Sequence, residues 1–162
     1  QFYITKDLNS LNLIDQEGEL VRKDKVYNLP SIFFFGFLNC PDICPNTLSE
    51  ISNLIVKLGK DSTKVNFFFV TVDPERDKVL DMKNYLSNFH EEIIGITGSI
   101  ENINKFLKSM HVYYEKIEIG DGLYTFDHSS QMFIFEKQGR FFGTTSLEEN
   151  ESIILNKIKT VF

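Results

Sequence analysis

Two cysteines, Cys40 and Cys44, are the residues of this chain most suited, by type and spacing, to carry out chemistry. They are the only cysteines in 162 residues, so there is no disulfide scaffold, and a pair this close in sequence is more often chemical than structural. If the stretch is helical, residues four apart share one face, and both sulfurs could reach one metal ion. At a helix N-terminus the helix dipole favours the thiolate, which is both a nucleophile and a soft ligand for Cu(I), zinc or an iron–sulfur cluster.

The three histidines bear on which metal two thiolates could share. We take His128 as the best third ligand, because it lies in the polar stretch 126–130 just before an expected strand. His90 is interpreted as a solvated cap at the end of a helix and His111 as structural. Structural zinc usually takes four protein ligands, and nothing in the histidine spacing supplies two of them, so two thiolates and one imidazole suit copper better. Asp127 could accept a hydrogen bond from the His128 ring and orient it. A lone histidine is more often a surface or packed residue, so the choice of His128 depends on the cysteine pair.

The residues around the cysteines predict the elements that would position them. Residues 31–37 (SIFFFGF) form a nearly continuous apolar run, which predicts a buried central strand that ends in the cysteine loop. Apolar residues at three- and four-residue spacing from Leu48 to Leu58 predict a helix after that loop, and Pro45 suits its first turn. A buried strand, a cysteine loop and then a helix is the active-site arrangement of thioredoxin-like folds.

The rest of the chain predicts further alternation of strands and helices. In order, the patterns indicate a hairpin over 11–21, a strand over 65–72, a turn at 73–77 leading to a helix that ends by 89, a strand over 93–97, a helix after the N-cap Ser99, an extended segment over 112–119, a strand pair over 131–137 and 140–145, and a final helix over 147–161.

These elements together predict one α/β domain over residues 1–162. Strands separated by helices, with an antiparallel pair late in the chain, indicate a thioredoxin-like fold with a mixed central sheet flanked by helices and an N-terminal β-hairpin. Within it, the acidic turn from Asp73 to Asp77 is, by itself, best interpreted as a helix start whose acids suit the helix dipole.

Composition excludes some functions. The net charge is −6, from 17 basic and 23 acidic residues, and no basic stripe is present, so nucleic-acid binding and a main affinity for anionic lipid are not expected. No apolar run is long enough to span a bilayer. Because the chain starts at Gln1 without a methionine, we expect a processed or trimmed domain from which an N-terminal anchor is missing.

Five segments carry a family resemblance. In chain order they are residues 36–45 (GFLNCPDICP), 72–77 (VDPERD), 96–98 (ITG), 112–114 (VYY) and 127–129 (DHS). The Cys-Pro-Asp-x-Cys-Pro motif followed by Asp-Pro-Glu-Arg-Asp is highly specific. With these segments the chain resembles the Sco/SenC family of copper chaperones, most weakly over its first forty residues.

The resemblance implies a thioredoxin-like domain held by an N-terminal membrane anchor, in the bacterial periplasm or, alternatively, on the mitochondrial inner membrane facing the intermembrane space. It implies one copper ion, as Cu(I) or Cu(II), bound by Cys40, Cys44 and His128, with Asp73 supporting the site without direct ligation. Family members assist assembly of the dinuclear copper centre in cytochrome c oxidase subunit II. That subunit is therefore the implied partner, with another copper chaperone as a possible donor.

Two hypotheses of different classes follow. In the first, the protein is a copper-delivery protein and no enzyme: reduced Cys40 and Cys44 hold copper with His128 and pass it to a partner by ligand exchange. In the second, the protein is a thiol–disulfide reductase, in which Cys40 attacks a disulfide and Cys44 resolves the mixed disulfide. Loss of His128 separates them, because it should harm only copper binding. A peroxidase and an interaction module with a structural disulfide are weaker alternatives.

Overall fold

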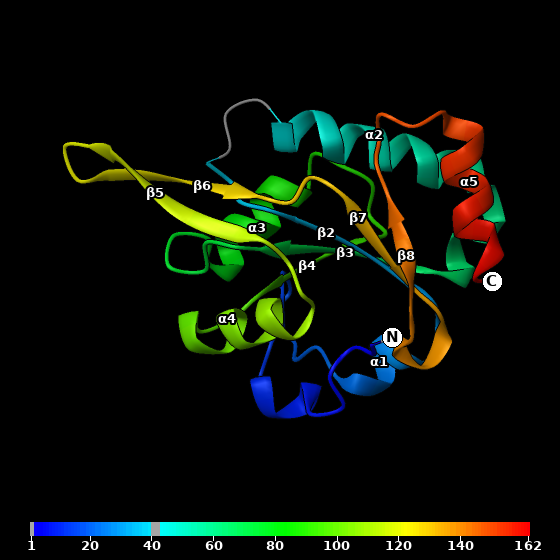
Figure 1. Ribbon diagram of the computed structural model, residues 1–162, viewed down its shortest axis with the longest axis horizontal. Coiled ribbons are helices and arrows are strands. Elements are labelled where there is room, and N and C mark those ends of the chain that lie inside the picture. Colours follow the sequence, from blue (N-terminus) through cyan, green and yellow to red (C-terminus); the bar gives the residue numbers. More distant parts are fainter. Residues whose placement is uncertain (1, 40–42) are drawn as a thin grey trace.

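A mixed sheet of six strands runs through the middle of the protein, in the order β1-β4-β3-β2-β7-β8 (Figure 1). The structure is a computed structural model that describes residues 2–39 and 43–162, with the backbone alone for residues 43–45. Strands β2, β3 and β4 are parallel to one another, and β1, β7 and β8 each run antiparallel to a neighbour. The strand bounds are β1 (Ile14–Asp15), β2 (Ser31–Gly36), β3 (Asn66–Thr71), β4 (Ile93–Thr97), β7 (Met132–Phe135) and β8 (Phe141–Thr145).

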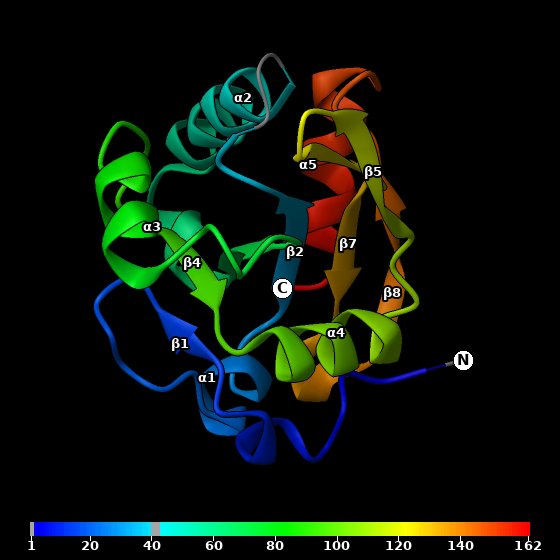
Figure 2. The same ribbon diagram turned by 90° about the vertical axis from the view of Figure 1, so that its left-hand side faces the viewer.

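Helices cover both faces of this sheet. Helices α2 and α5 lie on one side, and α1 and α4 lie on the other, as both views show (Figures 1 and 2). The helix bounds are α1 (Lys23–Tyr27), α2 (Ile43–Leu58), α3 (Val79–Leu86), α4 (Ile100–Ser109) and α5 (Glu151–Thr160). Within the described residues, none of these helices combines the length and the apolar composition needed to cross a membrane.

Phenylalanine rings fill the core around β2. Phe33 is fully buried, and its ring stacks on Phe68 of β3 with centroids 5.0 Å apart. Phe34, the next residue, points to the opposite face and stacks on Phe69 at 5.5 Å. Because both faces of β2 are covered, the strand is apolar throughout instead of alternating with polar residues. We call residues 37–44 the cysteine segment. The strand that leads into it is therefore held by packing on both faces.

The structure confirms the predicted fold class, a thioredoxin-like α/β fold with a mixed sheet flanked by helices. It also contains the expected N-terminal turn, at which the Asp15 amide donates to the Glu19 carbonyl (2.8 Å) and Gly18 has a positive φ of 80°. A single bridge, Ile14 to Leu20, closes this hairpin, while β1 pairs with β4. The hairpin is thus shorter than predicted, because its first strand joins the main sheet.

A second sheet was not predicted in full. Strand β5 (Tyr114–Gly120) pairs antiparallel with β6 (Leu123–His128), and the two form a ribbon that projects from the end of the molecule where β2 leads towards α2 (Figure 1). Asp121 and Gly122 make the turn and both have positive φ, 53° and 75°. An Asp-Gly pair is a strong hairpin signal. The sequence therefore held a signal for this hairpin, where we predicted only an extended segment over 112–119 and a polar stretch over 126–130.

Candidate metal centre

Strands β2 and β3 bring the cysteine segment and the acidic turn to the same edge of the sheet. Their register pairs Gly36 with Thr71, the last residues of the two strands, and the Val72 amide donates to the Gly36 carbonyl (2.8 Å). In the sequence, Cys40 comes four residues after the end of β2, and Asp73 comes two residues after the end of β3. The carboxyl edge of parallel strands is where open α/β sheets usually bind ligands.

The structure places one of the two cysteines. Cys44 is the second residue of α2, so its backbone lies in the first helical turn, where the dipole favours a thiolate. Cys40 lies outside the described residues. Among the side chains that the structure describes, no three from Asp, Glu, His and Cys gather into a metal-binding group. That Cys40, Cys44 and His128 share one ion therefore stays a prediction.

His128 is held beside the exit from β2. It is the last residue of β6 and is half-buried. Its ring meets Phe37 edge-on, with centroids 5.8 Å apart and an interplanar angle of 83°, and Phe126 from the same strand also meets Phe37, at 5.6 Å. Phe37 precedes Cys40 by three positions. Folding thus brings the imidazole next to the start of the cysteine segment.

The hydrogen bond of the His128 ring leaves one nitrogen available. Its Nδ1 atom lies 2.9 Å from the carbonyl oxygen of Ser129. A carbonyl oxygen only accepts, so Nδ1 carries the proton in this contact and the lone pair belongs to Nε2, as in a metal-binding histidine. The expected partner, Asp127, faces the other side of the strand, where it accepts from the Tyr113 hydroxyl (3.1 Å). A backbone carbonyl therefore orients the ring, and Asp127, which we expected to orient it, binds the Tyr113 hydroxyl instead.

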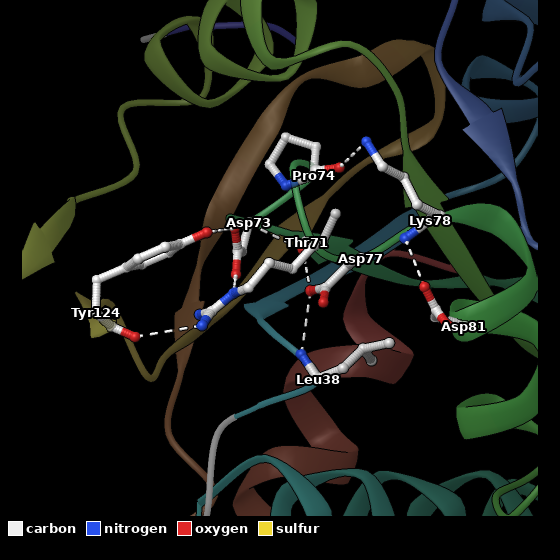
Figure 3. Close-up of polar contacts among 9 residues, drawn as sticks. Leu38, Thr71, Asp73, Pro74, Asp77, Lys78, Asp81 and Tyr124 are labelled. Atoms are coloured by element: carbon white, nitrogen blue, oxygen red, sulfur yellow. Dashed lines mark hydrogen bonds and ion pairs between the residues drawn. The ribbon is translucent and has the colours of Figure 1, made fainter. Parts of the chain in front are cut away.

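Asp73 supports the ribbon that carries His128. Its carboxylate is buried and forms an ion pair with Arg76, and it accepts from the Tyr124 hydroxyl (3.4 Å) (Figure 3). Arg76 in turn donates to the Tyr124 carbonyl (3.3 Å), and its guanidinium carbon lies 3.9 Å from the centre of the Tyr124 ring. Asp73 thus reaches β6 through Arg76 and Tyr124. We call these three residues the clamp; sequence reasoning missed Arg76 and Tyr124.

Asp77 ties the acidic turn to the chain before Cys40. It is 2% exposed, and one carboxylate oxygen accepts from the Thr71 hydroxyl (2.6 Å) and the Leu38 amide (3.1 Å) (Figure 3). Burial raises the pKa of Asp77 to about 6, although these two hydrogen bonds act in the opposite direction. Helix α3 begins only at Val79, so the interpretation of Asp73 and Asp77 as helix-dipole acids was wrong: they bind partners within the fold.

We expect Asp77 to make the stability of the protein depend on pH. Its folded pKa is raised from 3.8 to about 6, so it stabilises the fold below about pH 4, and this contribution is lost as pH rises through about 6. Relative to Asp77→Asn, the unfolding free energy of the wild type should fall by up to about 3 kcal/mol between pH 4 and pH 7. Urea unfolding of both proteins across this range measures the difference. The exposed Asp81→Asn is the control, and a wild-type-to-Asp77→Asn difference that does not change with pH would contradict the prediction.

The arrangement defines a class of protein. It is a thioredoxin-like protein in which a Cys-x-x-x-Cys segment enters a helix at the edge of parallel strands, with a histidine held next to it. Two thiolates and one imidazole nitrogen would make a donor set for a soft metal such as copper.

Comparisons with known proteins identify the family. The SCO1/SenC family model matches residues 8–162. An SCO2-like protein of Rickettsia prowazekii is 35% identical over 149 residues, which are 91% of this chain and 73% of the relative. The mitochondrial SCO1 homolog 1 of Arabidopsis thaliana is 38% identical over 131 residues, 80% of this chain and 39% of the relative. The structure of Bradyrhizobium japonicum ScoI with copper bound superposes with a TM-score of 0.86 at 38% identity, over 93% of this chain and 96% of that one. This chain belongs to the SCO1/SenC family.

Proposed function

We propose that this protein is a copper chaperone for cytochrome c oxidase assembly and that it holds one copper ion through Cys40, Cys44 and His128. The observation that carries the proposal is the position of His128, whose ring packs on Phe37 and keeps Nε2 available. The copper-bound structure of a relative at 38% identity supports the choice of metal. Residues 1–162 would act as one domain, with Asp73 supporting the site through the clamp.

Copper is cargo in this proposal. The start of α2 favours the thiolate form of Cys44 near neutral pH, and thiolates bind Cu(I) strongly. In the neutral His128 ring, the Ser129 carbonyl accepts the Nδ1 proton, so the lone pair that could bind the ion is on Nε2. A partner that offers its own thiolates or imidazoles could then take the ion by ligand exchange, one donor at a time.

Family membership supports a proposal for the partner and for the compartment. We propose the copper-binding domain of cytochrome c oxidase subunit II as the acceptor, with another copper chaperone as donor. Relatives occur in a bacterium and in mitochondria. We propose membrane anchoring through an N-terminal segment, with the domain in the bacterial periplasm or, alternatively, in the mitochondrial intermembrane space.

A copper titration tests the proposed function. The reduced protein should bind one equivalent of Cu(I) tightly in competition with a chromophoric chelator. The same protein with Cys40 and Cys44 oxidised to a disulfide should lose that binding, because the thiolates are consumed. Absence of tight binding by the reduced protein would remove the copper proposal and leave only the thioredoxin-like fold.

The position of Cys44 at the start of α2 also favours a second function, thiol–disulfide reduction. In this reaction the Cys40 thiolate attacks a partner disulfide and releases one partner thiolate. The Cys44 thiolate then attacks the mixed disulfide and releases the second, so the partner is reduced while the Cys40–Cys44 pair is oxidised. This reaction does not use His128, and that difference separates the two functions.

A further inference from the structure

The ribbon formed by β5 and β6 has two different faces. Side chains alternate along each strand, and on one face Tyr124 contacts Arg76 while Phe126 and His128 contact Phe37. This face is directed at the body of the protein. The opposite face, which we call the outer face, carries Glu115, Ile117, Leu123, Thr125 and Asp127. We count Ile119 with it, because this exposed residue lies at the irregularity between Glu118 and Gly120, opposite the Leu123 end of β6.

The outer face and its approach expose large apolar side chains. Ile117, Ile119 and Leu123 are 39%, 60% and 59% exposed, and Tyr113, just before β5, is 53% exposed. Single exposed apolar residues are normal, but a group of them on a projecting two-stranded ribbon is typical of an interaction site. The body-facing side already packs on Phe37 and the clamp, so the outer face is not needed to hold the ribbon.

Negative charge borders this apolar group. Glu115 and Asp127 are directly opposite each other in the β5–β6 ladder, a placement that is unfavourable for like charges. Both carboxylates lie 3.1 Å from the Tyr113 hydroxyl, whose single proton can serve only one of them at a time. Asp121 adds a third acid at the tip. The basic residue of the ribbon, Lys116, lies over the Tyr124 ring at 4.0 Å, on the body-facing side.

We propose that the outer face is a docking surface for a partner protein whose contact patch has an apolar centre bordered by lysine or arginine side chains. Such a patch would cover Ile119 and Leu123 and bring cations to Glu115 and Asp127, relieving their repulsion. Other occupants fit less well. A second copy would place acids against acids, and an anionic membrane would be repelled by the same charges.

The proposal rests on the proposed function, because the docked protein would be the one that exchanges copper. Asp127 is adjacent to His128 in β6 but points to the opposite face, so a partner on the outer face would contact the strand that carries the candidate ligand, behind the His128 ring. The clamp connects the other face of β6 to Asp73 and so holds the ribbon on the acidic turn. Docking on the ribbon would therefore hold the partner on the strand that ends at His128, from where its donor groups would have to reach the metal around the end of β6.

Charge reversal at Glu115 gives a sharp test. Glu115→Lys places a cation opposite Asp127, which should favour the ribbon, so lost binding cannot be attributed to unfolding of β5 and β6. The probe is the soluble domain of cytochrome c oxidase subunit II, with binding measured by calorimetry at low and high salt. We expect Glu115→Lys to weaken binding on the order of tenfold at low salt and to reduce its salt dependence. The double variant Ile119→Ser/Leu123→Ser should weaken binding at both salt concentrations.

Matched controls separate this inference from the proposed function. Glu19→Lys makes the same charge change on the N-terminal hairpin, and Val56→Ser makes the same kind of polar change at an exposed position of α2; both should bind as the wild type does. Copper affinity should stay unchanged in all four variants. Two results would overturn the docking proposal and leave the copper proposal standing. In both, the protein binds copper; in one the ribbon variants bind the subunit II domain as the wild type does, and in the other the wild type does not bind that domain. The docking proposal would also be overturned if the ribbon mediated self-association, or bound phosphatidylglycerol vesicles, instead of binding the subunit II domain.

Discussion

Replacing His128 with alanine is expected to lower the Cu(I) affinity of the reduced protein by about 100-fold or more. Changing a residue that only orients a ligand commonly lowers metal affinity 10–100-fold, and His128→Ala removes a donor itself. The ring contributes little to the core, because it is half-buried at the end of a strand, so the fold should persist. Competition with a chromophoric chelator measures the Cu(I) affinity, and thiolate charge-transfer absorption reports Cu(II).

The best control for His128→Ala is another histidine. His111 is exposed, packs on Phe2 at 4.7 Å and has a positive φ of 58°, a conformation that asparagine tolerates well. His111→Asn should therefore keep wild-type copper affinity. Thiol–disulfide exchange by Cys40 and Cys44 should survive in both variants. If His128→Ala binds copper as tightly as the wild type, His128 leaves the site and the thiol–disulfide reductase becomes the better function.

Asp73→Ala is expected to lower the free energy of unfolding by about 3 kcal/mol, the low end of the range for breaking a buried ion pair. Asp73 is 2% exposed, and its removal leaves the Arg76 guanidinium without its anion; one of the Arg76 nitrogens, Nη2, is already buried without a hydrogen-bond partner. The Tyr124 hydroxyl loses its acceptor as well. Chemical denaturation measures the loss of stability, and amide hydrogen exchange in β6 should rise as the ribbon loosens.

A double-mutant cycle shows whether Asp73 acts through the clamp. Asp73→Ala and Arg76→Ala should be non-additive by at least about 1 kcal/mol, since each removes the same ion pair. Glu19→Ala, at an exposed acid, should change stability by no more than about 0.5 kcal/mol. An Asp73→Ala variant as stable as Glu19→Ala would contradict the assigned role. Copper affinity of Asp73→Ala, measured where it is folded, should fall less than that of His128→Ala.

Much of the fold could be predicted because its elements carry local signals. The apolar run 31–37 predicts a strand covered on both faces, and all of β2 is indeed buried, with the rings of Phe68 and Phe69 packed against its two faces. The helical spacing after the cysteines gives α2, with Leu48 and Leu58 buried as expected. Ser99 caps α4 by accepting from the Asn102 amide (3.1 Å). Each of these features depends on residues close together in the chain.

The ribbon was harder to predict because its contacts are long-range. Strand β6 alternates around Tyr124 and Phe126, but a two-stranded ribbon buries little, so its apolar pattern is weak. The bond from Arg76 to the Tyr124 carbonyl joins residues 48 positions apart, and no spacing rule indicates it. The acidic turn was interpreted as a helix start for the same reason. The partners of Asp77 are Thr71, at the end of β3, and Leu38, just after β2, and only the sheet register brings these two positions together.

The sequence by itself determined the chemistry that is possible: a soft, close-spaced cysteine pair at a helix start, a histidine to add to it, and motifs specific to one family. These depend on residue type and local spacing, which the chain carries before it folds. Tertiary structure decided where the histidine lies. Only the packing of β6 against Phe37 brings His128 near the chain that precedes Cys40, and only strand alternation turns Asp127 away from its ring. Both outcomes follow from how distant strands meet, a property of the folded chain as a whole.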